Sequence, residues 1–230
     1  MIPTRKRIQL LKECLDSFNK KTIRKSLVEI LLKIDNDDLE TLQFAESYKS
    51  SIDIKIVLSD RKNGYGSLHE HYDSLANISE AEYLMVFNDD IEMITEGWEQ
   101  YFVPFRGKNH VLAVNNFKVK NGVTEPIFVN YNGNPSIPAD FYHEFGTLSH
   151  HPMLDDWWVH VCENVGKQYE KWLNVDLLFK RPDGETTDLP IDETFAEGRQ
   201  HINWSHHNSP ELGEYINKLR DYIQKYPEKF

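Results

Sequence analysis

The chain has 230 residues, 40% of them hydrophobic, which is enough to bury the core of one large α/β domain or two small ones. With 37 acidic and 26 basic residues its formal net charge is −11, so it lacks the basic footprint of a nucleic-acid-binding protein. No apolar run is long enough to span a membrane. Cys14 and Cys162 fall in helical apolar patterns, so we expect buried free thiols and a reducing, cytoplasmic compartment.

Helical and strand patterns alternate along the first hundred residues. In chain order, the spacing of apolar residues predicts helices over residues 8–18, 39–45 and 68–75, and strands over residues 28–34, 54–58 and 83–87. Strands that alternate with helices predict right-handed crossovers and a mostly parallel sheet. We therefore expect an α/β, Rossmann-type sheet flanked by helices.

The pattern becomes more mixed after Trp98. Asn121-Gly122 is typical of a hairpin turn between strands at 117–119 and 127–129. We also expect a strand over 110–114, a surface loop over 130–138, a helix over 155–172, a strand over 175–179, and a last helix with Ser209 as N-cap and Pro210 at its first position. No linker divides the chain, so a single domain over residues 1–230 is expected, with a smaller mixed part in its second half.

Acidic clusters follow two of the predicted parallel strands. Asp35-Asn36-Asp37-Asp38 ends one of them, and Asn88-Asp89-Asp90 comes directly after Phe87. In such sheets ligands bind beyond the carboxyl ends of the strands. Clustered carboxylates repel one another unless a cation lies among them, and Mg²⁺ or Mn²⁺ prefers such oxygen ligands and bridges diphosphates. The simpler interpretations are a solvated turn at the second cluster and a helix N-cap at Asp37 or Asp38.

Two other segments carry groups that suit a site. Residues 61–66 offer two cations and a permissive glycine backbone for an anion, although an ordinary glycine loop has the same composition. Asp155 and Asp156 lie beside apolar Trp157-Trp158, where a raised pKa suits a general base. Acids in the first turn of a helix also simply favour the helix dipole, and a transition-metal site with His206 is a third interpretation.

In their order, these segments resemble a family-2 glycosyltransferase of GT-A fold. Ile2-Pro3-Thr4-Arg5 looks like the "IPT" at the end of the family's first strand, and residues 34–38 fall at its "VDDGSxD" segment. Residues 61–66 match its "N-x-G" loop. Residues 86–90, followed by Gly97-Trp98, closely resemble "FLNxDxxxxxGW", a variant of the DxD motif. The ordered match continues to Asp155-Asp156-Trp157, which looks like the acidic pair on the acceptor side.

The resemblance implies transfer of a sugar from a nucleotide-diphosphate sugar to the hydroxyl of a saccharide or other acceptor, with inversion. Residues 1–100 are then expected to bind the donor, and residues 101–230 the acceptor. The implied nucleotide-sugar-binding residues are Pro3, Thr4, Arg5, Asp35, Asp37, Lys62, Asn63, Gly64, Asn88 and Asp89. The implied ligands of Mn²⁺ or Mg²⁺ are Asp90, Asp89 and His206, and the implied catalytic acids are Asp156 as base and Asp155 beside it.

Three departures from the family pattern bear on this interpretation. Only Met1 precedes the "IPT" segment, so either the sequence starts late or another segment fills the first-strand slot. The Gly-Ser of "VDDGSxD" is absent, and Asn88 replaces the first carboxylate of DxD. The alternatives are a nucleotidyltransferase, whose glycine-rich phosphate loop is missing near Arg7, a nucleotide-sugar-binding protein without catalysis, and a zinc hydrolase built on the His-rich segment.

Overall fold

The computed structural model describes residues 1–120, 123–127, 131–179 and 208–230. Its α-helices are α1 (Ile8–Lys21), α2 (Leu39–Ser47), α3 (Leu68–Ala76), α4 (Ala139–Phe145), α5 (Leu154–Val165) and α7 (Pro210–Lys225). Its strands are β1 (Ile2–Thr4), β2 (Glu29–Asp35), β3 (Asp53–Ser59), β4 (Tyr83–Met85), β5 (Ile91–Met93), β6 (Val111–Lys120), β7 (Val123–Pro126), β8 (Ser136–Pro138) and β9 (Glu170–Phe179). The predicted helices and strands of the first hundred residues are confirmed.

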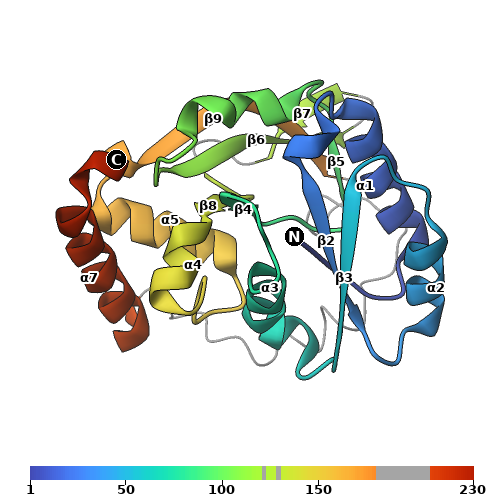
Figure 1. Ribbon diagram of the computed structural model, residues 1–230, viewed down its shortest axis with the longest axis horizontal. Coiled ribbons are helices and arrows are strands. Elements are labelled where there is room, and N and C mark those ends of the chain that lie inside the picture. The colour runs from blue at the N-terminus through green and yellow to red at the C-terminus, as the bar shows by residue number, and fades with distance from the viewer. Residues whose placement is uncertain (121–122, 128–130, 180–207) are drawn as a thin grey trace.

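A parallel three-stranded sheet, ordered β1-β2-β3, forms the first part of the fold. Residues 30–35 of β2, the middle strand, are all buried, as expected of a strand covered on both faces. Figure 1 shows α1 and α2 on one side of this sheet and α3 on the other. The second sheet is mixed and follows the order β4-β8-β6-β9-β5, with β7 paired to β6. The expected α/β fold, with a parallel part and a mixed part, is confirmed.

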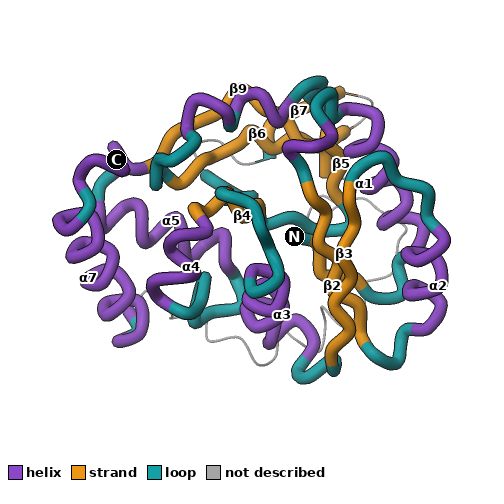
Figure 2. The backbone as a smooth tube through the Cα atoms, viewed as in Figure 1, coloured by secondary structure: helices purple, strands orange, loops and turns teal. Residues whose placement is uncertain are grey.

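The two sheets meet at Met1 (Figure 2). The Met1 nitrogen donates to the Met85 carbonyl at 3.0 Å, and the Phe87 N–H donates to the Met1 carbonyl at 3.1 Å. On its other side β1 pairs in parallel with β2, with Ile2 opposite Leu32. The three residues of β1 therefore occupy the slot between β2 and β4, and the carboxyl ends of these three strands become neighbours.

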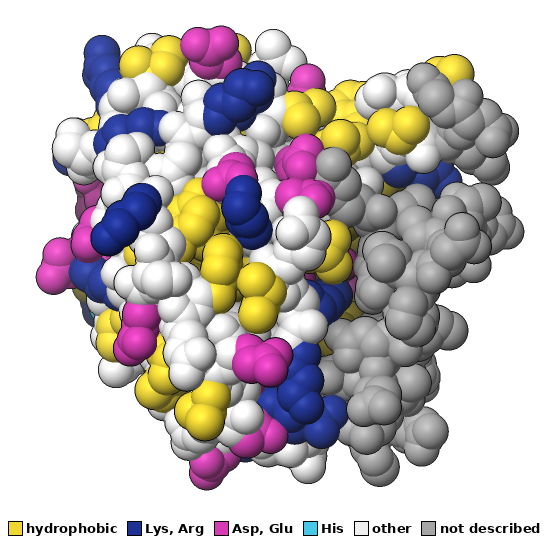
Figure 3. Space-filling view, turned by 90° about the vertical axis from the view of Figure 1, so that its right-hand side faces the viewer, with side chains coloured by type: hydrophobic (Ala, Val, Ile, Leu, Met, Phe, Trp, Pro, Cys, Tyr) yellow, Lys and Arg dark blue, Asp and Glu magenta, His cyan; other side chains and the backbone are white. Residues whose placement is uncertain are grey.

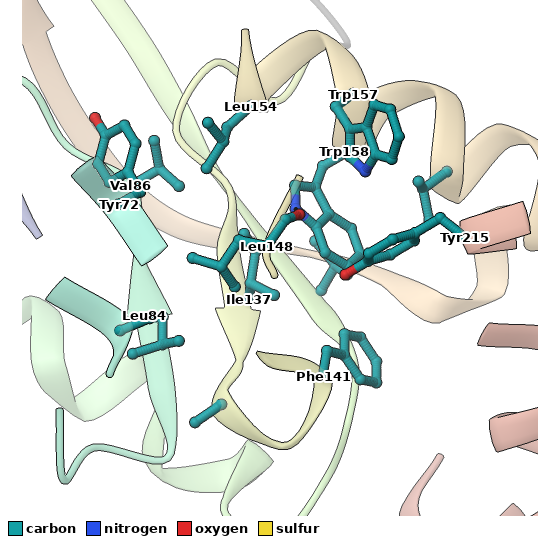
Figure 4. Close-up of a cluster of buried hydrophobic side chains, with 14 of the residues drawn as sticks. Tyr72, Leu84, Val86, Ile137, Phe141, Leu148, Leu154, Trp157, Trp158 and Tyr215 are labelled. Carbon is teal, nitrogen blue, oxygen red and sulfur yellow. The ribbon is translucent and has the colours of Figure 1, made fainter. Parts of the chain in front are cut away.

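Aromatic side chains fill the core between the second sheet and helices α4, α5 and α7. Trp157 and Trp158 are each 1% exposed. The Trp158 ring stacks on Phe141 at a centroid distance of 5.8 Å, and its edge meets Tyr215 at 5.7 Å. Figure 4 shows this cluster extending to Tyr72 at the other end of the core. The tryptophan pair therefore serves packing, and neither ring offers a face to a sugar.

Two expectations for the second half of the chain are wrong in detail, and a third is only partly described. The predicted helix over 155–172 ends at Val165, because Gly166 has φ +136° and stops it, and β9 begins only a few residues later. In the predicted hairpin, β7 pairs with β6 and the Ile127 N–H donates to the Asn116 carbonyl at 2.9 Å, whereas Asn121-Gly122 and residues 128–129 lie outside the described residues. The expected surface loop over 130–138 contains β8, and its Asn132 and Asn134 are 2% and 1% exposed.

The Gly97-Trp98-Glu99 segment fixes the end of α1. The Gly97 N–H donates to the Lys21 carbonyl at 2.7 Å, and the Trp98 indole N–H donates to the Thr22 hydroxyl at 2.9 Å. A carboxylate oxygen of Glu99, which is 4% exposed, accepts from the backbone N–H of Arg24 at 2.8 Å. This part of the family-like motif therefore has a structural role.

The state of the cysteines and the distribution of surface charge are as the sequence leads us to expect. Both cysteines, Cys14 and Cys162, are buried and free, as predicted. On the face shown in Figure 3, Lys and Arg side chains alternate with Asp and Glu, and apolar groups lie between them. No helix in the described ranges is long and apolar enough to cross a membrane.

Candidate functional site

The segment after β4 carries Asp89, the least exposed acid among the described residues. Asp89 is 0% exposed, and its Oδ2 accepts from the Thr4 hydroxyl at 2.6 Å and from Arg7 Nε at 3.1 Å. Arg7 Nη2 pairs with the other oxygen, Oδ1, so the guanidinium grips Asp89 with two nitrogens. Arg7 Nη1 also lies 3.4 Å from the carboxylate of Asp90. Burial raises the pKa of Asp89 to about 6, against the opposing charge of Arg7.

This arrangement corrects the inference from sequence about these acids. The sequence predicts that Asp89 and Asp90 are tolerable only with an imported cation among them. The structure instead supplies a cation from its own chain, because Arg7 contacts both carboxylates. Asp89 faces protein donors on both of its oxygens, whereas the Asp90 side chain is 15% exposed. The two neighbouring acids therefore differ in what they can offer a ligand.

A second ionic cluster lies at the end of β2. Asp35 is 5% exposed and pairs with Arg5 Nη1 at 2.8 Å and with the ammonium of Lys33, which is itself 1% exposed. Arg5 also donates to Asp37, with Nη2 at 2.8 Å from Oδ2, and these hydrogen bonds lower the pKa of Asp37 to about 2. Pro3 faces Lys33 in the β1–β2 register. Residues expected to hold the nucleotide thus come together, but Asp35 already has two cationic partners.

Asp38 caps the helix that follows this cluster. Its Oδ1 accepts from the Thr41 N–H at 3.3 Å, at the start of α2. Its Oδ2 accepts from the backbone N–H of Lys6 at 2.6 Å. The N-cap interpretation of this acidic run is confirmed for Asp38, which also ties the segment after β1 to the end of β2.

The loop after β3 lies beside the same cluster. Lys62 and Gly64 have positive φ angles of 51° and 55°, and Asn63 stands between them. Burial, with smaller contributions from the charges of Lys33 and Lys62, lowers the pKa of His71 to about 4. The Asn36 amide donates to Asp60 Oδ1 at 2.8 Å, which joins the start of this loop to the segment after β2, and the Lys62 ammonium pairs with Glu70. The three loop residues expected to bind the donor lie near the end of β2.

Tyr72 of α3 contacts the segment that follows β4. Its hydroxyl donates to the Phe87 carbonyl at 2.8 Å and contacts Asn88 Oδ1 at 3.1 Å. Burial raises the pKa of Tyr72, and among its other causes are the negative charges of Asp155, Asp89 and Asp90. The Tyr72 hydroxyl therefore holds the Phe87 carbonyl and the Asn88 side chain at the end of this strand.

The acidic pair on α5 has two different environments. The Tyr131 hydroxyl donates to Asp155 Oδ2 at 3.2 Å, and burial raises the pKa of Asp155 to about 6. The Asp156 side chain is 28% exposed, and its Oδ2 lies 3.8 Å from His160 Nε2. Asp155 is therefore held inside the site wall, while Asp156 remains accessible to a molecule outside it.

Four residues that shape this site were not singled out from the sequence. Arg7, Lys33, Tyr72 and Tyr131 each contact an acid or amide that was predicted to act there. Arg7 belongs to the basic run Arg5-Lys6-Arg7, which suggests a phosphate contact. Lys33 interrupts an otherwise apolar strand, and that interruption could have marked it as a functional residue. Tyr72 and Tyr131 fit apolar or loop patterns, and nothing local marked them.

The donor set suits a cation that takes most of its ligands from elsewhere. Within the described ranges no group of three or more His, Cys, Asp and Glu side chains is arranged to hold a metal ion. Asp90 offers one partly exposed carboxylate at a strand end. Mg²⁺ and Mn²⁺ sites often use one or two carboxylates and complete the shell with water and substrate phosphates, so these residues fit such an ion. His206, the other expected ligand, lies outside the described residues.

A cavity of about 320 Å³ lies away from these acids. It is lined by Glu29 and Tyr83, the first residues of β2 and β4, and by Trp98. The cavity is thus at the amino ends of the strands, whereas ligands of parallel sheets bind at the carboxyl ends. We assign the candidate site to the acid cluster rather than to this cavity.

Comparisons with known proteins show which family and which solved structures this chain resembles. Residues 1–162 match the family model described as glycosyl transferase family 2. The crystal structure of S. aureus TarS is similar to 98% of this chain, with a TM-score of 0.59 and 15% identity, and the chain spans 42% of that protein.

Structures of TarS residues 1–349 give a similar result. The complex with UDP matches 100% of this chain and 80% of that one, with a TM-score of 0.57 and 16% identity. The complex with UDP-GlcNAc matches 98% of this chain and 73% of that one, with a TM-score of 0.56 and 14% identity. At these identities the likeness shows a shared fold. A comparison with curated proteins gave no significant match.

Proposed function

Because the chain belongs to glycosyl transferase family 2, it is a glycosyltransferase, and we propose that it moves a sugar from a nucleotide-diphosphate sugar to an acceptor hydroxyl with inversion. One observation supports this proposal: Asp35 with Arg5, and Asp89 and Asp90 with Thr4 and Arg7, form linked ionic clusters at the carboxyl ends of β1, β2 and β4. That edge is where an α/β sheet binds nucleotides.

The donor is proposed to lie across the ends of β1 and β2. Arg5, Lys33 and Lys62 are the cationic side chains of this region that a nucleoside diphosphate could contact, although each also pairs with a carboxylate of the chain. Asp35 and Asp37, paired with Arg5, are positioned to accept from ribose hydroxyls or a base N–H. A TarS structure holds UDP-GlcNAc, which makes this sugar nucleotide the first donor to test.

Asp90 is the proposed principal ligand of Mn²⁺ or Mg²⁺. When bound, the ion neutralises charge that develops on the leaving diphosphate. Asp89, locked between Thr4 and Arg7, keeps the strand end in place. Asn88, held beside the Tyr72 hydroxyl, contributes an uncharged amide where most DxD motifs have a carboxylate.

Asp156 is the proposed general base on the acceptor side. It is accessible, so an acceptor hydroxyl can reach its carboxylate and give up a proton as the oxygen attacks the anomeric carbon. Asp155, fixed by Tyr131, is proposed to position the start of α5. We further propose residues 1–100 as the donor half, residues 101–230 as the acceptor half, and a cytoplasmic location, supported by the two buried free thiols.

Donor turnover tests these assignments. Release of UDP from UDP-GlcNAc is measured with and without MnCl₂ for the wild type and for Asp90→Ala, Asp156→Asn and Asp155→Asn. We expect metal-dependent release that falls by a factor of about 10² or more in Asp90→Ala, and acceptor transfer that falls by about 10²–10⁴ in Asp156→Asn. Full metal-dependent turnover in Asp90→Ala would refute the metal site. Normal transfer by Asp156→Asn with loss in Asp155→Asn would move the base to Asp155.

A further inference from the structure

Arg7 contacts both acids of the Asp89-Asp90 pair and has no role in the proposed reaction. Its guanidinium reaches Asp89 through Nε and Nη2 and Asp90 through Nη1. The residue sits at the start of α1, only 24% exposed, so it is a fixed part of the site wall. A planar fork that pairs with two adjacent carboxylates restricts the orientation of both.

The charges of Arg7, Asp89 and Asp90 determine how strongly these residues attract a cation. The Arg7 guanidinium lies against both Asp89 and Asp90, with Nη1 3.4 Å from the Asp90 carboxylate. A divalent ion bound to Asp90 would be repelled by this neighbouring positive charge. A donor diphosphate adds negative oxygens at the same strand ends and restores the attraction.

We propose that Arg7 is the resident counter-ion of the acid pair and makes metal binding depend on the donor. In the free protein, Arg7 holds Asp89 and Asp90 and keeps metal affinity low. With the donor present, the diphosphate oxygens complete the site and the metal binds tightly. Arg7 is thus a positioning residue that couples metal and nucleotide. This inference rests on the proposed function, since it assigns the diphosphate to this edge of the sheet.

Mn²⁺ binding without turnover tests the proposal. Free Mn²⁺ is measured by electron paramagnetic resonance during titration of the wild type and of Arg7→Gln, at pH 8, with MnCl₂ alone and then with UDP added. We expect Arg7→Gln to bind Mn²⁺ alone at least about tenfold more tightly than the wild type. We also expect UDP to raise Mn²⁺ affinity strongly in the wild type and less in Arg7→Gln.

Two variants control the comparison. Arg106→Gln removes an exposed arginine that pairs with Glu82, far from the strand carboxyl ends, and should leave both titrations unchanged. Arg7→Lys keeps the charge but loses the fork, so its affinity for Mn²⁺ alone should stay within about threefold of wild type. If Arg7→Gln does not unfold cooperatively, and so is not properly folded, the Mn²⁺ affinity of Arg7→Lys is compared with that of the wild type instead.

The outcomes separate this inference from the function beneath it. Equal Mn²⁺ affinity in Arg7→Gln and wild type overturns the role of Arg7, as does a tenfold change in Arg7→Lys. A wild type that binds Mn²⁺ but neither UDP nor UDP-GlcNAc contradicts the proposed function, while the Mn²⁺-only comparison still decides whether Arg7 is the counter-ion.

Discussion

Asp155 shows how one side chain can reduce stability at the point where it serves the site. Its pKa is raised to about 6 from the ordinary 3.8, so the folded chain holds this proton more tightly than the unfolded chain does. Folded stability therefore falls as the pH rises from about 4 to about 6 and then levels off. At neutral pH the ionised, enclosed carboxylate is a net cost to folding.

Asp155→Asn should consequently stabilise the protein at pH 7.5. The amide removes the enclosed charge and still accepts from Tyr131, so we expect a gain of about 1–3 kcal/mol. The gain should shrink as the pH falls from 6 and disappear near pH 4. Thermal unfolding of both proteins across this pH range measures it, with the exposed Asp221→Asn on α7 as a control. A gain that persists at pH 4, or a loss at pH 7.5, contradicts the pKa assigned to Asp155.

At the scale of elements, the connection from α1 to β2 depends on a segment that comes much later in the chain. Gly97 has φ +67°, and its N–H holds the last turn of α1. A Cβ at this position would lie 2.9 Å from the Gln100 amide nitrogen and 3.0 Å from Ile23 Cδ1. A left-handed backbone is itself unfavourable for any side chain, so only glycine suits this turn.

Gly97→Ala should therefore lower the free energy of unfolding by roughly 1–2 kcal/mol. Gly213 provides the matched control, since it lies inside α7 and a Cβ added there would have no neighbouring atom within 4 Å. Gly213→Ala should raise the same quantity by roughly 0.5–1 kcal/mol, because alanine favours helix. Urea denaturation of the two variants gives the comparison. Equal effects of one sign would show that φ and crowding at Gly97 do not control the turn.

At the scale of the whole molecule, much of the first half was predictable from sequence. Period-2 and period-3.6 patterns placed β2, β3 and α1 to α3 within a few residues. Parallel topology then placed Asp35 and Asp90 at one edge, because strand carboxyl ends meet there. The second half was harder, since Gly166 ended a helix inside an apolar pattern and buried amides such as Asn132 resembled a loop.

The partners within the site could not be predicted, because they are tertiary contacts. That Arg7 grips Asp89, 82 residues away, and that Tyr131 bonds Asp155 depends on how the two sheets pack. The sequence pattern revealed the acids and suggested a metal for their charge. In the folded chain Arg7 and Lys33 neutralise part of that charge, and the side chains of Asp90 and Asp156 remain partly exposed.

The central claim is that the edge formed by Thr4, Asp35 and Asp90 binds a nucleotide-diphosphate sugar. Thermal unfolding of the wild type with UDP-GlcNAc and MnCl₂ tests it most directly. At a ligand concentration of about 100 times Kd, binding adds about 2.7 kcal/mol, which raises Tm by about 5–10 °C for a chain of this size. Asp90→Ala should lose most of this rise. A wild-type Tm that stays unchanged with UDP-, GDP- and TDP-sugars, each with MnCl₂, would contradict the claim.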